Sequence, residues 1–134
     1  MISTTSDPAA RRMVVIVDDD PAVGNSLKFS LEIEGYTALV YGSGAAVLES
    51  ADLPNAGCIV IDFYLPDMDG LDLLAQLRER GVHLAPILIT TEPSAILRGR
   101  AEKAGAPIVE KPLLNSGLSD AIRRAVSVAA RDQP

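Results

Sequence analysis

Residues 58–70 read CIVIDFYLPDMDG. The stretch opens with four apolar residues, Cys58 to Ile61, and a short apolar run of this kind is typical of a parallel strand covered on both faces. Asp62 closes the run, and the Pro, Asp and Gly residues that follow favour a loop. The sequence therefore predicts a buried strand that ends on a carboxylate and leads through a loop into a helix.

Four further apolar runs lie along the chain with room for a helix between them. They are Met13–Val17, Tyr36–Tyr41, Ile87–Ile89 and Ile108–Val109. Strands that alternate with helices build a parallel sheet with helices on both faces. We expect a doubly wound (βα)5 α/β fold with strand order 2-1-3-4-5. The second run has polar neighbours and fits an edge strand, whereas the other four fit strands covered on both faces.

Local signals predict where the helices begin and end. Asp20 and Pro21 favour a helix start, because Asp accepts hydrogen bonds from free N–H groups and Pro tolerates the first turn. Gly35 predicts the end of that helix. Later helices are predicted over Gly70–Arg80 with Gly81 as its stop, over Pro93–Gly105 and over Gly117–Ala129.

Length, charge and cysteine content limit the function class. The 134 residues fit one domain, expected at 13–130 with tails at 1–12 and 131–134, and the lack of a linker favours a complete protein. We expect no membrane segment, and the net charge of -6 argues against direct binding to nucleic acid. The single cysteine, Cys58, cannot form an internal disulfide, which fits a cytoplasmic protein.

Polar residues follow four of the five predicted strands. They are Asp18, Asp19 and Asp20 after the first strand, Asp62 after the third, Thr90 and Thr91 after the fourth, and Lys111 after the fifth. The carboxyl ends of parallel strands share one edge, where ligands bind beside the point at which the strand order reverses. That point lies between the first and third strands, so we expect their carboxylates to meet.

Carboxylates crowded at this edge predict a bound cation. Two of them about 4 Å apart repel by about 4 kcal/mol at an effective dielectric of about 20, so they should bind protons or a metal ion. Oxygen ligands without a nearby Cys or His favour Mg²⁺. Lys111 and Thr90 would supply the donors that a phosphoryl group needs, which makes Asp62 the candidate nucleophile.

These residues resemble the receiver domain of two-component response regulators, which has a flavodoxin-like, three-layer fold. The resemblance covers about residues 13–130. It rests on Val17-Asp18-Asp19-Asp20, Ile61-Asp62-Phe63-Tyr64-Leu65-Pro66-Asp67-Met68-Asp69-Gly70, Ile89-Thr90 and Glu110-Lys111-Pro112. By this resemblance Asp18, Asp19 and Asp62 would hold Mg²⁺ together with the backbone carbonyl of Tyr64. Asp62 would accept a phosphoryl group from a sensor histidine kinase or a phosphotransfer protein.

The resemblance also implies how the signal leaves the site. Thr90 would hydrogen-bond the phosphoryl group, Lys111 would pair with it, and the Lys111–Pro112 bond would be cis. The surface formed by the fourth helix, the fifth strand and the fifth helix would then rearrange. A downstream protein would bind the changed surface, and a homodimer through it is a further option. The domain would not be an enzyme, beyond assisting its own phosphorylation and dephosphorylation.

Two residues depart from the usual receiver pattern, and two others occupy positions that affect hydrolysis of the acyl phosphate. Ile108 stands where receivers usually carry the Tyr or Phe that swings inward, so the usual aromatic readout is in question. Thr91 replaces a commoner Ala or Gly, and its bulk could restrict access to Asp62. Tyr64 and Glu92 occupy positions that tune hydrolysis of the acyl phosphate in the family, which leaves the lifetime of the phosphorylated state open.

Three alternative functions remain. A degenerate receiver would bind partners without phosphate, and Ile108 and Thr91 favour it. A Mg²⁺ phosphohydrolase of the haloacid-dehalogenase class is suggested by the acidic run at 18–20, which resembles an Asp-x-Asp motif, but no Gly-Asp-x-x-x-Asp motif follows. A flavin-binding flavodoxin would need a phosphate-binding loop rich in Ser, Thr and Gly where three aspartates stand.

Several polar residues have structural explanations. Helix capping accounts for Asp20, and a turn accounts for Asp67 and Asp69. His83, in the loop before the fourth strand, receives no role. A solvated helix face, which an acidic partner could use, accounts for Arg98, Arg100 and Lys103.

Overall fold

The computed structural model describes residues 12–54, 56–113 and 117–131, and within them five strands alternate with five helices. The strands are β1 (Met13–Val17), β2 (Thr37–Tyr41), β3 (Cys58–Asp62), β4 (Ala85–Thr90) and β5 (Ile108–Glu110). The helices are α2 (Pro21–Ile33), α3 (Gly44–Leu48), α4 (Gly70–Glu79), α5 (Ala95–Ala104) and α6 (Gly117–Arg131). The predicted tails lie outside the described residues, apart from Arg12 and Arg131.

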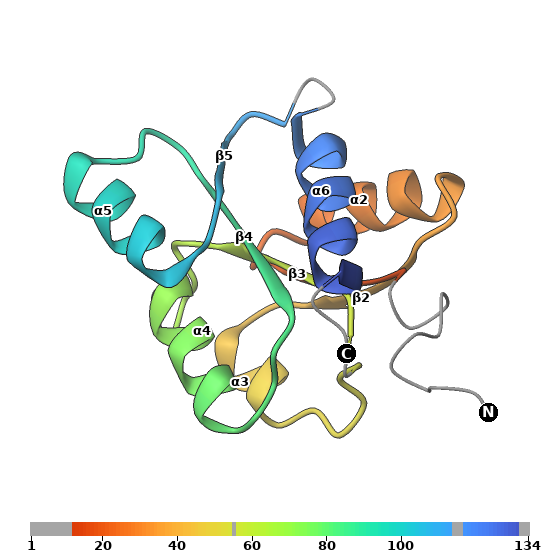
Figure 1. The fold of residues 1–134 in the computed structure, drawn as a ribbon, viewed down its shortest axis with the longest axis horizontal. Helices are drawn as coiled ribbons and strands as arrows, with labels where there is room; N and C mark the ends of the chain where they lie inside the picture. Colours follow the sequence, from red (N-terminus) through yellow and green to blue (C-terminus); the bar gives the residue numbers. More distant parts are fainter. Residues whose placement is uncertain (1–11, 55, 114–116, 132–134) are drawn as a thin grey trace.

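The strands form one parallel sheet in the order β2-β1-β3-β4-β5, which confirms the predicted doubly wound fold. Figure 1 shows α2 and α6 on one face of this sheet and α3, α4 and α5 on the other. Successive residues of a strand point to opposite faces, so β1 contributes to two cores. Val15 and Val17 lie in the core that includes leucines of α4, whereas Val14 and Ile16 lie in the core that includes Ile122 of α6.

The two edge strands are less buried than the centre of the sheet. β2 lies at one edge, as predicted. β5 forms the other edge, and its residues Ile108 and Val109 are only half-buried. Ile108 packs against the core that includes α5 and Val109 against the core that includes α6, so side chains cover both faces of this strand, although less completely than at the centre of the sheet. β4 begins at Ala85 and is longer than the apolar run that predicted it.

The helices follow most of the predicted boundary signals. Gly35 and Gly105 have positive φ angles of 95° and 69°, in the region that favours glycine, and each stands just after a helix. α5 begins at Ala95 after a capping Ser94, not at Pro93, because the Ser94 hydroxyl accepts a hydrogen bond from the first turn.

Two helices differ from what the sequence indicated. The five-residue α3 had no predicted bounds, and α6 continues to Arg131 instead of ending at Ala129. Residue 131 therefore belongs to the helix and not to the predicted tail. Within the described residues, no helix combines the length and the apolar character needed to cross a membrane.

Candidate functional site

Asp18 and Asp62 lie on neighbouring strands at the carboxyl end of the sheet. Asp62 is the last residue of β3, Asp18 directly follows β1, and the register pairs Val17 with Ile61. Asp18 is 2% exposed and Asp62 6%. Asp19 is exposed, yet one oxygen of each of these three carboxylates lies within 4.8 Å of the other two. The structure thus brings together the carboxylates predicted to meet.

The ammonium group of Lys111 bridges the two buried carboxylates. Its Nζ donates to Asp18 Oδ2 at 3.1 Å and to Asp62 Oδ2 at 2.9 Å. Lys111 directly follows β5, and its backbone N–H donates to the carbonyl of Thr90 at 2.8 Å, which places the residue beside the end of β4. The Lys111–Pro112 bond is cis, as predicted. The predicted positive charge therefore lies in the site.

Burial and this ion pair shift the pKa values of both partners. Burial raises the pKa of Asp62, although hydrogen bonds from Lys111 and from the Tyr64 N–H act in the opposite direction. Burial alone would lower the pKa of Lys111, but its hydrogen bonds to Asp62 and Asp18 prevail and raise it. Lys111 is thus held in its charged form, and ionising Asp62 costs free energy that a bound cation would offset.

Thr90 ends β4 and lies close to Asp62 in the sheet, since the register pairs Asp62 with the preceding Ile89. It is 1% exposed, and its hydroxyl donates to the carbonyl of Thr91 at 3.2 Å. Thr91 is exposed, and Glu92 has a φ of 44°, which is uncommon for a residue other than glycine. The Thr90 hydroxyl is therefore buried near the site but engaged with backbone.

The backbone of the loop between β3 and α4 closes on itself. The Phe63 carbonyl accepts from the Gly70 N–H at 2.7 Å, and Tyr64 forms an antiparallel bridge with Asp69. The Tyr64 N–H donates to Asp62 Oδ1 at 3.1 Å, while the residue as a whole is 63% exposed. The Tyr64 backbone is thus anchored beside the carboxylates, and metal binding by its carbonyl stays a prediction.

Helix capping explains Asp20, as predicted, and it also explains Asp69, for which a turn was predicted. Asp20 caps α2 by accepting from the Ala22 N–H at 3.0 Å, and its own N–H donates to Asp18 Oδ1 at 2.9 Å. Asp69 caps α4 by accepting from the Asp72 N–H at 2.8 Å. Neither carboxylate belongs to the acidic group that could hold a metal.

Sequence reasoning missed the contacts of Asp67. Its two carboxylate oxygens accept hydrogen bonds from the N–H groups of Gly44 at 3.1 Å and Ala45 at 2.8 Å, at the start of α3. These hydrogen bonds, chiefly the one from Ala45, lower the pKa of Asp67. The predicted turn role is incomplete, because this residue joins the loop after β3 to a separate helix.

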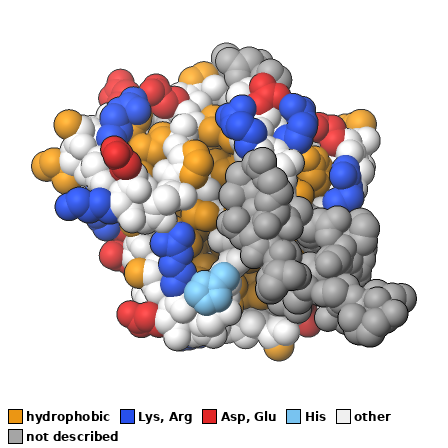
Figure 2. All heavy atoms as spheres, viewed as in Figure 1, with side chains coloured by type: hydrophobic (Ala, Val, Ile, Leu, Met, Phe, Trp, Pro, Cys, Tyr) orange, Lys and Arg blue, Asp and Glu red, His pale blue; other side chains and the backbone are white. Residues whose placement is uncertain are grey.

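The arginines of α5 are exposed, as predicted, but they form ion pairs. Arg98 pairs with Glu110 at 2.9 Å, and Arg100 pairs with Asp69 at 3.4 Å. Exposed pairs of this kind add little stability. Figure 2 shows acidic and basic side chains interspersed over one face, with the pale-blue histidine visible at the surface. That residue is the exposed His83, and nothing in its position suggests a role.

The chain matches the family model described as response regulator receiver domain over residues 14–123. It is 37% identical over 118 residues to the transcriptional regulatory protein FixJ of Azorhizobium caulinodans. It is 34% identical over 121 residues to the C4-dicarboxylate transport transcriptional regulatory protein DctD of Pseudomonas aeruginosa. These matches cover 87% and 89% of this chain. The chain spans about half of FixJ (56%) and about a quarter of DctD (26%).

Solved structures show the same fold. The crystal structure of FixJ-N has a TM-score of 0.76 at 34% identity, over 86% of this chain and 93% of that chain. A CheY-like response regulator receiver domain protein from Methanospirillum hungatei has a TM-score of 0.78 at 27% identity, over 90% and 98%. Both TM-scores show that these chains share the fold described above.

Proposed function

This chain belongs to the response regulator receiver domain family, whose members are signalling switches and not classical enzymes, and from that premise we propose that Asp62 is its phosphoacceptor. The observation that carries the proposal is the placement of the Lys111 ammonium between the carboxylates of Asp18 and Asp62. The donor would be a phosphohistidine of a sensor histidine kinase or a phosphotransfer protein.

The acidic group fits a divalent cation. Asp18, Asp19 and Asp62 offer carboxylate oxygens within 4.8 Å of one another, and oxygen ligands are those that Mg²⁺ prefers. Together with the backbone carbonyl of Tyr64 these residues would hold one Mg²⁺ ion. When bound, the ion would supply positive charge to the oxygens of the transferring phosphoryl group. It would also relieve the cost of ionising the buried Asp62.

The proposed transfer step uses the Asp62 carboxylate, which lies beside the Lys111 ammonium, as the nucleophile. A carboxylate oxygen of Asp62 forms a bond to phosphorus while the phosphorus–nitrogen bond of the phosphohistidine breaks. The electron pair of that bond goes to the imidazole nitrogen. Lys111 lies within hydrogen-bonding distance of Asp62 and would pair with the phosphoryl oxygens. The Thr90 hydroxyl would leave the Thr91 carbonyl and donate to the same group.

The donor would approach through a cavity of about 580 Å³ beside the site. Thr91, Lys111 and Leu113 line it together with Ala22 and Ser26 of α2. Its small and apolar side chains would leave room for an imidazole ring. The Lys111 ammonium group could then donate to the phosphoryl oxygens. The exposed Thr91 would act as part of this entrance.

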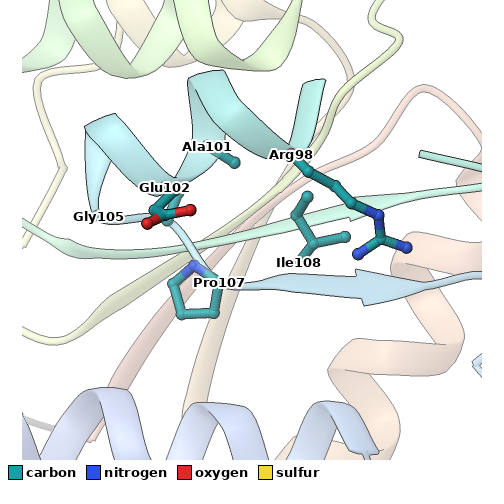
Figure 3. A pocket seen from close by; sticks show the side chains of 7 residues that line it. Arg98, Ala101, Glu102, Gly105, Pro107 and Ile108 are labelled. Carbon is teal, nitrogen blue, oxygen red and sulfur yellow. The ribbon is translucent and has the colours of Figure 1, made fainter. Parts of the chain in front are cut away.

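The output surface would be α5, β5 and α6. In Figure 3 the Ile108 side chain lies beside Arg98, under α5, at a hollow of about 480 Å³ that Pro107 and Glu102 also line. A branched aliphatic side chain therefore occupies the position of the usual aromatic switch. We propose that a downstream protein binds this surface, with a homodimer as the other option and without direct nucleic-acid contact. A cytoplasmic location is part of the proposal and rests on the family.

The second candidate function is a receiver that binds partners without phosphate. The observation that favours it is Ile108, which stands where receivers usually carry a Tyr or Phe. The aromatic side chain that usually swings inward is therefore absent from this position. The complete set of carboxylates and the ion-paired Lys111 favour the phosphoacceptor. The two candidates make opposite predictions about covalent phosphorylation.

Intact-mass spectrometry after incubation with acetyl phosphate tests the proposal. The wild-type chain should gain one phosphoryl group with Mg²⁺ and none in EDTA. Asp62→Asn should gain none, while Asp52→Asn, which changes an exposed aspartate, should behave as wild type. A wild-type chain that never gains mass would favour the phosphate-independent module. Equal labelling of the Asp62→Asn variant would place the acceptor elsewhere.

A further inference from the structure

We propose that Asp67 is a positioning residue for the metal site. Its carboxylate joins the β3–α4 loop (Phe63–Asp69) to α3. This contact would help to hold the Tyr64 carbonyl, which the proposed function assigns to Mg²⁺. The inference rests on the proposed function, because it presupposes that the acidic group binds Mg²⁺. It adds a residue that binds neither the metal nor the phosphoryl group.

The first support is the contact itself. Asp67 is exposed, yet both of its carboxylate oxygens are used, one by the Gly44 N–H and one by the Ala45 N–H. The first N–H groups of a helix lack partners within it, and a carboxylate satisfies them with charge-assisted hydrogen bonds. The contact spans 22 and 23 residues of sequence, so it ties two separate segments together.

The second support is an apolar contact at the same place. A Cβ atom on Gly44 would lie 2.6 Å from the Sδ of Met68, so this side chain packs directly against the first residue of α3. Gly44 is buried, and the Gln76 amide donates to the Met68 sulfur at 3.7 Å. Two consecutive loop residues, Asp67 and Met68, thus contact α3, one through charge and one through packing.

The third support is the path from this contact to the metal site. The Phe63–Gly70 hydrogen bond and the Tyr64–Asp69 bridge close the base of the loop. Asp67 lies in the segment between these two closures and ties that segment to α3. The Tyr64 N–H donates to Asp62 Oδ1, so Tyr64 belongs both to the site and to the loop that Asp67 ties to α3. Asp18 and Asp62 stand at strand ends and do not depend on it. Losing the contact should therefore weaken metal binding without removing a carboxylate ligand.

Calorimetric titration of the full chain with Mg²⁺ tests this inference. Asp67→Ala should raise the Kd for Mg²⁺ by about tenfold, at the low end of what residues that orient metal ligands contribute. Asp67→Asn loses the same charge but keeps one oxygen that can accept from Ala45, so its Kd should be intermediate. Asp52→Ala, with an exposed aspartate, should match wild type. Equal Kd values for Asp67→Asn and Asp67→Ala would show a charge effect alone and would overturn the inference.

A second variant tests the packing contact without a change of charge. Gly44→Ala places a methyl group against Met68 and should raise the Mg²⁺ Kd, and adding Met68→Ala should reverse the effect. In metal-free protein, amide hydrogen exchange at Ala45 should be faster in Asp67→Ala and intermediate in Asp67→Asn. A wild-type chain that does not bind Mg²⁺ would overturn the proposed metal site and this inference together. Tight wild-type binding with an unchanged Kd in Asp67→Ala would overturn the inference alone.

Discussion

Negative charge exceeds positive charge around Asp62. This residue shares the Lys111 ammonium with Asp18, and Asp19 adds a third carboxylate close by. One positive charge therefore faces three negative ones. The raised pKa of Asp62 expresses the same imbalance, because burial disfavours its ionised form more than Lys111 favours it. The ionised form of Asp62 is thus disfavoured in the metal-free site, and a bound cation would stabilise it.

Asp62→Asn should stabilise the metal-free protein. Because the folded pKa of Asp62 is raised, the stability that this carboxyl contributes is fully present below its unfolded pKa and is lost as pH rises through the folded pKa. Asparagine avoids that loss at neutral pH, so Tm in EDTA should rise by roughly 2–5 °C. Calorimetric scans at about pH 7 and about pH 4 should show the gain shrinking in acid. A lower Tm at neutral pH would mean that the Lys111 pair outweighs burial.

The sequence sufficed for residues whose position is set by a strand end. Asp18 and Asp62 each close an apolar run, and Lys111 follows the last strand, so parallel topology alone brings them to one edge. Asp67 could not be found this way. Its partners Gly44 and Ala45 are more than 20 residues away and belong to a helix whose bounds no local pattern indicated.

At the scale of elements, the start of α4 presses against the end of β3. A Cβ atom on Gly70 would lie 2.9 Å from the backbone oxygen of Asp62, 2.9 Å from Ile61 and 3.0 Å from Leu88. Backbone and buried side chains cannot give way as a flexible side chain does. The helix therefore needs glycine at its first position in order to approach the strand that carries Asp62.

Gly70→Ala should destabilise the protein by about 1–3 kcal/mol, as overpacking a tight contact usually does. Gly99→Ala is the matched control, because Gly99 lies exposed within α5 with no atom within 4 Å of its Cβ position. That variant should be more stable than wild type by about 0.5–1 kcal/mol, since alanine favours a helix interior. Urea unfolding measures both. A neutral Gly70→Ala would refute the close approach.

Element type was easier to predict than element environment. Leu71, Leu74 and Leu77 recur at helical spacing in the sequence predicted as a helix over Gly70–Arg80, and all three are buried in α4. The five residues of α3 are too few to show a period, and their helix depends on neighbouring elements. The predicted strand order placed β5 at an edge, but its apolar sequence did not show that Ile108 and Val109 are only half-buried.

At the scale of the whole molecule, the sheet connects the proposed phosphoacceptor, Asp62, with the proposed output surface. β4 carries Thr90 and pairs with β5, which holds Ile108 and leads to Lys111. α5 is joined to this region by the Arg98–Glu110 pair. A change at Thr90 and Lys111 therefore has a short path to α5 and β5, even without an aromatic switch.

Beryllofluoride with Mg²⁺, which mimics the bound phosphoryl group, should shift amide NMR signals beyond the site. We expect changes that spread from Asp62 and Thr90 into α5, β5 and α6, because strand β5 links these elements. Asp62→Asn should show no such spread. Shifts confined to the ends of β1, β3 and β4 in the wild-type chain would contradict a working output and favour the phosphate-independent module.

Chemical mapping of the acceptor tests the central claim most directly. Borohydride reduces an acyl phosphate of aspartate to homoserine, so peptide mass spectrometry after phosphorylation identifies the modified residue. The account predicts conversion at residue 62, dependent on Mg²⁺, with residues 18 and 19 unchanged. Conversion at a different aspartate, or none in a chain shown to bind Mg²⁺, would contradict it.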